Sequence, residues 1–224
     1  MKALVIDSAA SNMVIAAKNE NITATLSLDL GQKQSQKILP AIDYVLKQVD
    51  LDSKELDYTA LCSGPGTFTG LRLAFSALKA IELAHDVPVY GIPSLDVYAE
   101  SFKNFDAQIV SVIDAKKDQF FAAIYENGNT VHQAEDTSVE KICGKLNAEK
   151  PVIVCGPDAK IFGDLLLNLN PKLNLKYTSS QPLATDSLFS IAESFIEQKK
   201  EPLADYDGPV YLRKSEAEIA LEKK

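Results

Sequence analysis

Short apolar stretches separated by polar turns open the chain, which is the pattern of β-strands. The expected strands form an antiparallel meander and cover residues 2–7, 12–17 and 22–28. Gly31 interrupts this pattern, and apolar residues then recur at helical spacing from Ser35 to Val49. Pro40 lies inside that helix, so we expect its entry to be irregular or kinked.

A strand, a tight turn and a helix follow one another in Leu61–His85, LCSGPGTFTGLRLAFSALKAIELAH. The apolar run Tyr58–Cys62 predicts the strand, and the helical pattern begins near Phe68, where Thr67 is placed to cap it. A further strand is expected at 87–92 and a helix from Pro93-Ser94 to Phe102. Strands joined through a crossover helix run parallel, so these elements predict a mixed sheet flanked by helices.

The chain then repeats this arrangement. Asp7 in ALVIDSAASNMVIAA aligns with Asp114 in VSVIDAKKDQFFAAI, and each run reads as strand, four-residue turn, strand. VIVCGPD at 152–158 repeats ALCSGPG at 60–66 in the same order. We therefore expect two halves of the same topology, residues 1–104 and 105–224. Helices expected at 139–146, 159–167 and 186–197 complete the second half.

Duplicated halves of this kind indicate the α/β, actin-like (ASKHA, RNase H-like) fold class, in which nucleotide binds between the halves. In such folds the phosphates lie against glycine-containing turns of each first hairpin. The turns here, 7–11 and 114–118, contain no glycine, and Asp118 adds a negative charge. We therefore expect no nucleotide and no other cofactor.

The turn GPGTFTG at 64–70 resembles a phosphate-binding loop only superficially. It lacks the Lys-Ser/Thr of a P-loop and the spacing of a dinucleotide fingerprint, and Pro65 removes one N–H group. A structural turn is favoured over an anion site, and both interpretations stay open.

Composition limits the partners. With 31 Asp and Glu against 23 Lys and Arg, the net charge of −8 disfavours unaided binding to nucleic acid. No run of about 18 apolar residues occurs, which predicts a cytoplasmic protein without a membrane span. Cys62, Cys143 and Cys155 lie too far apart for a zinc motif, and the first and last read as buried strand residues.

Candidate catalytic groups are few. His85 and His132 are isolated, so no metal site is expected, and His85 instead suits the end of its helix. No nucleophile elbow is present. Asp7 and Asp114 facing each other across the cleft remain an alternative, but nothing places a substrate beside them. We therefore assign no catalytic residue.

The two helices at 35–49 and 68–85 carry more apolar surface than one contact layer requires. We expect them to dock as a four-helix bundle against the same helices of a homologous subunit, or against a second copy about a two-fold axis. Contact with a helix of the same chain is the alternative for the small residues of the second helix. The expected interface residues are Ile38, Leu39, Ile42, Val45, Leu46, Gly70, Leu71, Ala74, Ala77, Leu78 and Ile81.

These residues carry a resemblance. SGPGTFTGLRLAFSALKAIELAHDVPVYGIPSL at 63–95 resembles the TsaB (YeaZ) family of tRNA threonylcarbamoyladenosine biosynthesis proteins, as do IDAKKDQFFAAIY at 113–125, PVYLRKSEAE at 209–218 and ILPAID at 38–43. The family usually has His-Ser where this chain has Gln34-Ser35, and Asp-Thr-Ser where it has Asp7-Ser8-Ala9.

The resemblance implies an actin-like subunit without catalytic activity. Its partner would be the larger, metal-carrying paralogue TsaD, which transfers threonylcarbamoyl to the adenosine beside the anticodon, and a TsaE-like ATPase would join the complex. A homodimer would form when the paralogue is absent, and tRNA would be contacted only through the complex. The alternative is an ATP-binding actin-like enzyme or a glycoprotease-like peptidase.

Overall fold

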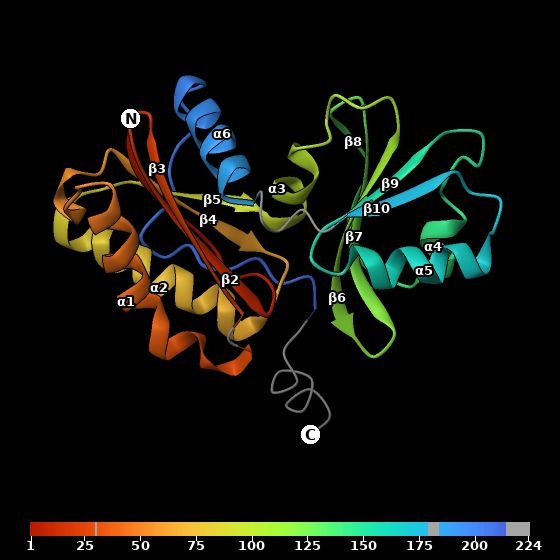
Figure 1. The fold of residues 1–224 in the computed structure, drawn as a ribbon, viewed down its shortest axis with the longest axis horizontal. Coiled ribbons are helices and arrows are strands. Elements are labelled where there is room, and N and C mark those ends of the chain that lie inside the picture. Colours follow the sequence, from red (N-terminus) through yellow and green to blue (C-terminus); the bar gives the residue numbers. More distant parts are fainter. Residues whose placement is uncertain (30, 179–183, 214–224) are drawn as a thin grey trace.

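The computed structural model describes residues 1–29, 31–178 and 184–213, which form two sheets lying side by side (Figure 1). The first sheet contains β1 (Lys2–Asp7), β2 (Asn12–Asn19), β3 (Ile22–Asp29), β4 (Tyr58–Gly64) and β5 (Val89–Pro93). The second contains β6 (Gln108–Lys116), β7 (Gln119–Glu126), β8 (Asn129–Thr137), β9 (Val152–Cys155) and β10 (Leu175–Thr178).

Both sheets have the same topology. The first has the order β3-β2-β1-β4-β5 and the second the order β10-β9-β6-β7-β8. In each, three strands form an antiparallel meander and two more add in parallel. The two matching orders confirm the duplication that the sequence predicts.

Helices cover the sheets on both sides. They are α1 (Gln34–Gln48), α2 (Phe68–His85), α3 (Ser94–Glu100), α4 (Val139–Cys143), α5 (Ala159–Leu169) and α6 (Ala184–Glu197), with short 3-10 turns at Gly31–Lys33 and Ser53–Glu55. In Figure 1, α1 and α2 lie outside the first sheet, α4 and α5 outside the second, and α3 and α6 between the sheets. Each half of the sequence thus contributes two helices to the outside and one to the space between the sheets.

Strand alternation explains this layering. Leu4 and Ile6 of β1 pack under α1 and α2, whereas Ala3 and Val5 face the other way, into a core that both halves share. Successive side chains of a strand point to opposite faces, so a strand covered on both faces is apolar throughout. β1 and β4 are buried along nearly their whole length for this reason.

The sequence predicts that the last helix completes the second half, but the structure places it elsewhere. α6 packs on the first sheet, where the Tyr58 hydroxyl donates to Glu193 Oε1 at 3.1 Å and Lys18 Nζ lies 2.6 Å from the same atom. α3, which follows the first sheet, contacts the second through Tyr125, whose hydroxyl donates to Asp96 Oδ1 at 2.6 Å. The expectation was wrong because the sequence repeat assigns an element to a half by order, whereas packing assigns it by contact.

Three local expectations have different outcomes. The turn between β6 and β7 contains two residues and not the expected four, and Lys116, Lys117 and Asp118 all have left-handed φ angles near 60°. Thr67 occupies the cap position of α2, but its side chain makes no capping hydrogen bond. The irregular entry to α1 is confirmed as a 3-10 turn, although Pro40 itself sits inside the helix. Lys214–Glu218 of the PVYLRKSEAE motif lie outside the described residues.

Candidate functional site

The start of α2 is filled by the first hairpin. The Thr67 N–H donates to the Ala9 carbonyl at 2.7 Å, and the Thr67 hydroxyl donates to the Ser8 carbonyl at 3.4 Å. Two backbone carbonyls thus point at the positive end of the helix, where a phosphate would otherwise bind. This geometry supports the structural interpretation of the GPGTFTG turn over an anion site.

The glycines of this turn allow that close approach. A Cβ atom on Gly66 would lie 2.6 Å from the Ala9 carbonyl oxygen, and one on Gly70 would lie 2.0 Å from that of Ser8. Gln34 is buried and donates through Nε2 to the carbonyls of Ala10 at 3.1 Å and Ser11 at 2.9 Å. Its side chain therefore fastens the hairpin from the other side.

Asp7 is fully buried and serves this same region. Its carboxylate accepts from the Ala9 N–H at 3.0 Å and from the Tyr98 hydroxyl at 3.0 and 3.1 Å. Burial, and then the neighbouring Asp7 carboxylate, raise the pKa of Tyr98 and of Cys62 well above their usual values. Both groups therefore stay neutral at physiological pH and hold the carboxylate in a structural role.

The hypothetical Asp7–Asp114 pair has a different geometry from the one acid–base catalysis would use. Asp114 binds Lys116 Nζ at 2.6 Å and lines a pocket of about 470 Å³ between the halves, whereas Asp7 is not among the residues that line it. The residues lining this pocket are Pro65, Gly66, Thr67, Phe68, Asp114, Ala115, Lys116, Lys117, Phe121, Val210, Tyr211, Leu212 and Arg213.

Most of the expected interface residues are buried in the interior of the protein. All except Leu39 and Ile81 are buried, and most of them pack in the cluster between α1, α2 and the first sheet. Ala74 and Ala77 belong to this cluster, so the small residues of α2 serve the contact with α1 that the sequence left as an alternative. Leu71 faces the core shared by the halves.

A groove nevertheless opens between α1 and α2 on the outer surface. It has a volume of about 440 Å³. Ile42, Leu46 and Ala77 are buried residues that line it, while Leu39 is 64% exposed. A second group of residues completes the lining: Asp43, Lys47, Leu51, Asp52, Ser53, Ala80, Ile81, Ala84 and His85. The groove is thus apolar between the helices and polar at its edge.

His85 lies at the edge of this groove. It ends α2, as the sequence predicts, and its Nε2 lies 3.2 Å from the Ser53 hydroxyl. Within the described residues no group of three or more His, Cys, Asp or Glu side chains is arranged to hold a metal ion. Among the helices that the structure describes, none combines the length and apolarity needed to cross a membrane.

The helix pair of the second half is shorter than the α1–α2 pair. α4 packs against α5 but has 5 residues where α1 has 15, so it covers α5 over a shorter length. Ile161, Leu165 and Leu169 of α5 are 56%, 41% and 48% exposed and line a pocket of about 580 Å³. The duplication therefore extends to the topology but not to the surface.

Comparison with known proteins identifies the family of the chain. The family model described as "TsaD: tRNA N6-adenosine threonylcarbamoyltransferase" matches residues 29–221. The TsaB protein of Bacillus subtilis (strain 168), named as a tRNA threonylcarbamoyladenosine biosynthesis protein, is 26% identical over 226 residues, covering 97% of this chain and 96% of its own. TsaB of Escherichia coli (strain K12) is 25% identical over 232 residues with the same coverage.

The chain belongs to the TsaD family and, within it, to the TsaB (YeaZ) proteins. A solved structure of YeaZ from Pseudomonas aeruginosa matches with a TM-score of 0.73 at 19% identity, covering 94% of this chain and 99% of that one. This similarity confirms the fold of two actin-like halves. The resemblance read from SGPGTFTGLRLAF and the other motifs is likewise confirmed.

Sequence reasoning missed two groups that organise the site. The PVYLR motif indicates the family, but it does not predict that Tyr211 contacts Phe68 or that Arg213 binds Asp136. Gln34 was noted only as a departure from the family pattern. Gln34 lies one helical turn before Ile38 on the buried face of α1, and this position was the available sign that Gln34 is buried. No local pattern identifies the partners of Arg213.

Proposed function

We propose that this TsaB-family chain is a non-catalytic subunit that acts with a TsaD-like paralogue in threonylcarbamoyl transfer to the adenosine beside the anticodon of tRNA. The filled start of α2 carries the proposal. Ser8 and Ala9 fill the start of α2 against Gly70, so this helix start has no open place for a phosphate group. The family supplies the pathway, and the occupied hairpin supports a partner role within it.

The α1–α2 groove is the proposed partner surface. Leu39 and Ile81, with the exposed Ala80 and Ala84, would contact the equivalent helix pair of the paralogue, and Ala77 would form part of the groove floor. The buried residues of the expected interface would then act by fixing the spacing of the two helices rather than by touching the partner. Helix pairs of this kind interlock when small residues allow close approach.

Four further assignments complete the proposal. A TsaE-like ATPase would join the assembled complex, and a second copy of the chain would occupy the groove when the paralogue is absent. Binding of tRNA would require the complex, because the net charge of −8 opposes a phosphate backbone. The place of action would then be the cytoplasm, where tRNA is modified.

The experiment measures binding of the TsaD-like paralogue from the same organism by calorimetry and light scattering. Leu39→Glu and Ala84→Glu should each weaken binding at least tenfold, about 1.4 kcal/mol, because they place a charge in an apolar groove. Leu83→Glu is the matched control: Leu83 is 88% exposed on the same helix and outside the groove lining. Wild-type affinity in both groove variants would place the interface elsewhere.

A reconstituted assay of threonylcarbamoyl transfer to tRNA completes the test. The chain alone should show no transfer, the paralogue alone little, and the mixture of both with the TsaE-like ATPase full activity. Leu39→Glu should lower the activity of the mixture, and a higher concentration of the variant should restore it, because only association is impaired. Transfer by the chain alone would overturn the non-catalytic assignment.

A further inference from the structure

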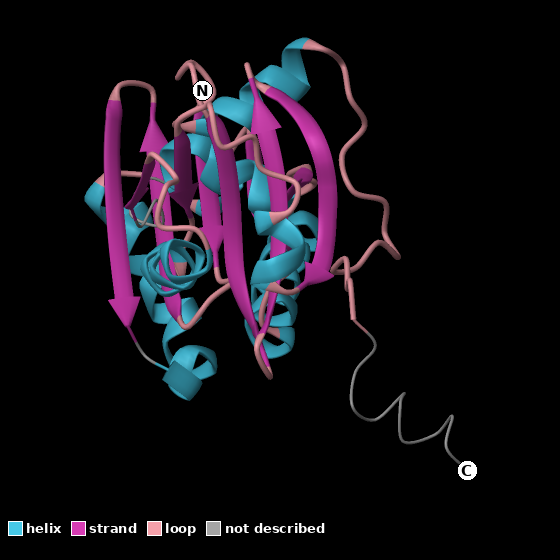
Figure 2. Cartoon of the chain, turned by 90° about the vertical axis from the view of Figure 1, so that its right-hand side faces the viewer, coloured by secondary structure: helices cyan, strands magenta, loops and turns pink. Residues whose placement is uncertain are grey.

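The chain after α6 runs back across the first half as an extended segment, which Figure 2 shows as a loop along one edge of the molecule. We call residues 203–213 the C-terminal strap. Its start is fastened to the first sheet and to α2. The Leu203 N–H donates to the Val89 carbonyl at 2.8 Å, and Lys79 Nζ donates to the carbonyls of Leu203 at 3.0 Å and Ala204 at 2.9 Å.

The middle of the strap passes over the glycine-rich turn. The Val210 N–H donates to the Ser63 carbonyl at 2.7 Å. A Cβ atom on Gly64 would lie 2.2 Å from the Val210 carbonyl oxygen, and the Gly64 φ of +119° is one that only glycine adopts without strain. The first glycine of the GPGTFTG turn is therefore explained by the strap, and not by a ligand.

Tyr211 attaches the strap to the first turn of α2. Its ring stacks on Phe68 with the ring centroids 5.1 Å apart, and its hydroxyl accepts from Arg72 Nε at 3.0 Å. The Arg72 guanidinium also lies 3.8 Å from the centroid of the Phe68 ring. Two aromatic rings and a cation thus hold this part of the strap to the first half.

Arg213 then crosses to the second half. Its Nε and Nη2 donate to the two carboxylate oxygens of Asp136 on β8 at 2.6 and 2.8 Å, and its Nη1 donates to the Ala115 carbonyl on β6 at 2.8 Å. Such two-pronged guanidinium–carboxylate pairs are directional as well as strong. Arg213 is therefore bound to two strands of the second sheet, while the residues just before it are bound to the first half.

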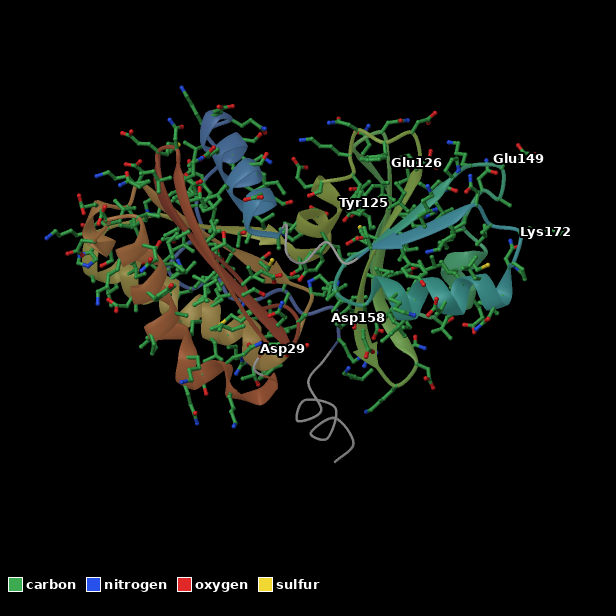
Figure 3. The ribbon with its side chains drawn as sticks, viewed as in Figure 1. Asp29, Tyr125, Glu126, Glu149, Asp158 and Lys172 are labelled. Carbon is green, nitrogen blue, oxygen red and sulfur yellow. The ribbon has the colours of Figure 1, made fainter. Side chains whose placement is uncertain are left out.

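The halves also meet on the opposite side of the cleft. There α3 and α6 contribute to a core containing residues of both sheets, including Val5, Leu188 and Ile109. Tyr125, labelled in Figure 3, reaches from β7 to Asp96 of α3 on this side. The pocket of about 470 Å³ lies at the strap side, between the glycine-rich turn and the β6–β7 turn. The shared core and the strap thus hold the two halves from opposite sides.

We propose that the C-terminal strap is a clasp that keeps the cleft closed, with Arg213 as the residue that latches it to the second half. The shared core around α3 and α6 acts as the hinge. Release of the Arg213–Asp136 pair lets the halves separate at the pocket, because this ion pair is the charged contact that holds the strap to the second sheet. The clasp works within one chain and is independent of the proposed partner surface.

The test measures the distance between the halves by pulsed electron resonance. Spin labels are placed at exposed Lys37→Cys on the first half and at exposed Lys172→Cys on the second, which Figure 3 shows at the outer end of the molecule. Cys143→Ser removes the partly exposed native thiol, and Cys62 and Cys155 are buried. Arg213→Met, which keeps side-chain length but removes the guanidinium, should widen the distance distribution.

Hydrogen exchange gives the second readout. The Val210 amide should exchange about tenfold faster in Arg213→Met, while amides in β1 and β2 keep their rates, because the clasp opens locally. Lys145→Met is the matched control: Lys145 binds Glu135, the neighbour of Asp136 on β8, but both of its partners belong to the second half. This control should change neither readout.

Three results would overturn the proposal. An unchanged distance distribution in Arg213→Met would make the strap a surface attachment without control over the halves. Equal effects of Arg213→Met and Lys145→Met would assign the change to loss of any ion pair on β8. If Arg213→Met accelerates hydrogen exchange throughout the chain, the distance measurement is repeated with Asp136→Asn. This variant removes the ion pair but keeps the hydrogen bond from Arg213 to the Ala115 carbonyl. A distance distribution in Asp136→Asn as narrow as in wild type would also reject the clasp.

Discussion

Ser8 contacts Gly70 both through its side-chain hydroxyl and through its backbone carbonyl oxygen. The Ser8 hydroxyl donates to the Gly70 carbonyl at 2.7 Å. A Cβ atom on Gly70 would lie only 2.0 Å from the Ser8 carbonyl oxygen. Sixty-two positions separate them in the chain. The first hairpin and α2 therefore fit together only because Gly70 has no side chain.

Gly70→Ala should destabilise the protein by about 1–3 kcal/mol, because the new methyl group meets a backbone oxygen that cannot rotate away. Urea unfolding measures the change. Gly208→Ala is the control, since a Cβ atom there would have no neighbour within 4 Å, and it should change stability by less than about 0.5 kcal/mol. Equal stability of Gly70→Ala and wild type would show that the hairpin can move away from α2.

The isolated chain should neither bind ATP tightly nor hydrolyse it. The Ala9 carbonyl already accepts the Thr67 N–H that a phosphate would need, and the Asp114 carboxylate lines the pocket between the halves, where it would repel a phosphate. Calorimetry with ATP and magnesium should give no isotherm. Low-micromolar binding, equivalent to roughly −8 kcal/mol, would restore the enzyme alternative.

Ala77→Glu and Ala84→Glu should separate folding from partner binding. Ala77 is 7% exposed and packs between α1 and α2, so a glutamate there should cost several kcal/mol of folding stability. Ala84 is exposed at the open end of the groove, so its glutamate variant should keep a wild-type melting temperature. Circular dichroism measures both. A stable Ala77→Glu monomer would mean that this face of α2 is free to turn outward.

Asp96 should make stability depend on pH in the acidic range. Burial raises the pKa of Asp96 above its unfolded value of about 3.9, despite the hydrogen bond from Tyr125. The folded state then binds more protons than the unfolded state, so the contribution of this group to stability falls as pH rises from about 4 through the folded pKa. Asp96→Asn should remove that slope while keeping an acceptor for Tyr125.

Chemical unfolding at a series of pH values from 3.5 to about 7 measures the effect. Relative to wild type, Asp96→Asn should gain stability as pH rises, because the wild-type chain must then bury a charge. Asp164→Asn is a control: Asp164 lies on the surface of α5, and Lys160 lowers its pKa, so its slope should have the opposite sign. A pH-independent difference between Asp96→Asn and wild type would contradict this account.

The lone chain should bind tRNA only weakly at physiological salt, since its net charge is −8 and the cations of the cleft are largely paired. A gel shift at roughly 150 mM salt, where the Debye length is about 8 Å, should show no complex. Addition of the TsaD-like paralogue should produce one. A shift by the chain alone that excess tRNA competes away would contradict the dependence on a complex.

The periodicity of the sequence by itself determined the elements and their order. Apolar runs at β1 and β6, and later apolar runs that reach Cys62 and Cys155 before a Gly-Pro turn, predicted two halves because strand and helix patterns depend on neighbours near in sequence. Burial of both cysteines followed for the same reason. Motifs of SGPGTFTG type also identified the family, because that turn depends on local backbone shape.

Contacts between distant residues were decided only by the tertiary structure. The sequence placed Ala74 and Ala77 on a helix seam, but only packing showed that α1 fills it and that the groove beyond contains Leu39 and Ala84. It likewise assigned α6 to the second half, whereas the fold places it on the first sheet. Arg213 meets Asp136 across 77 positions, and no pattern of a few residues can encode a partner at that distance, because what brings the two together is the folding of everything between them.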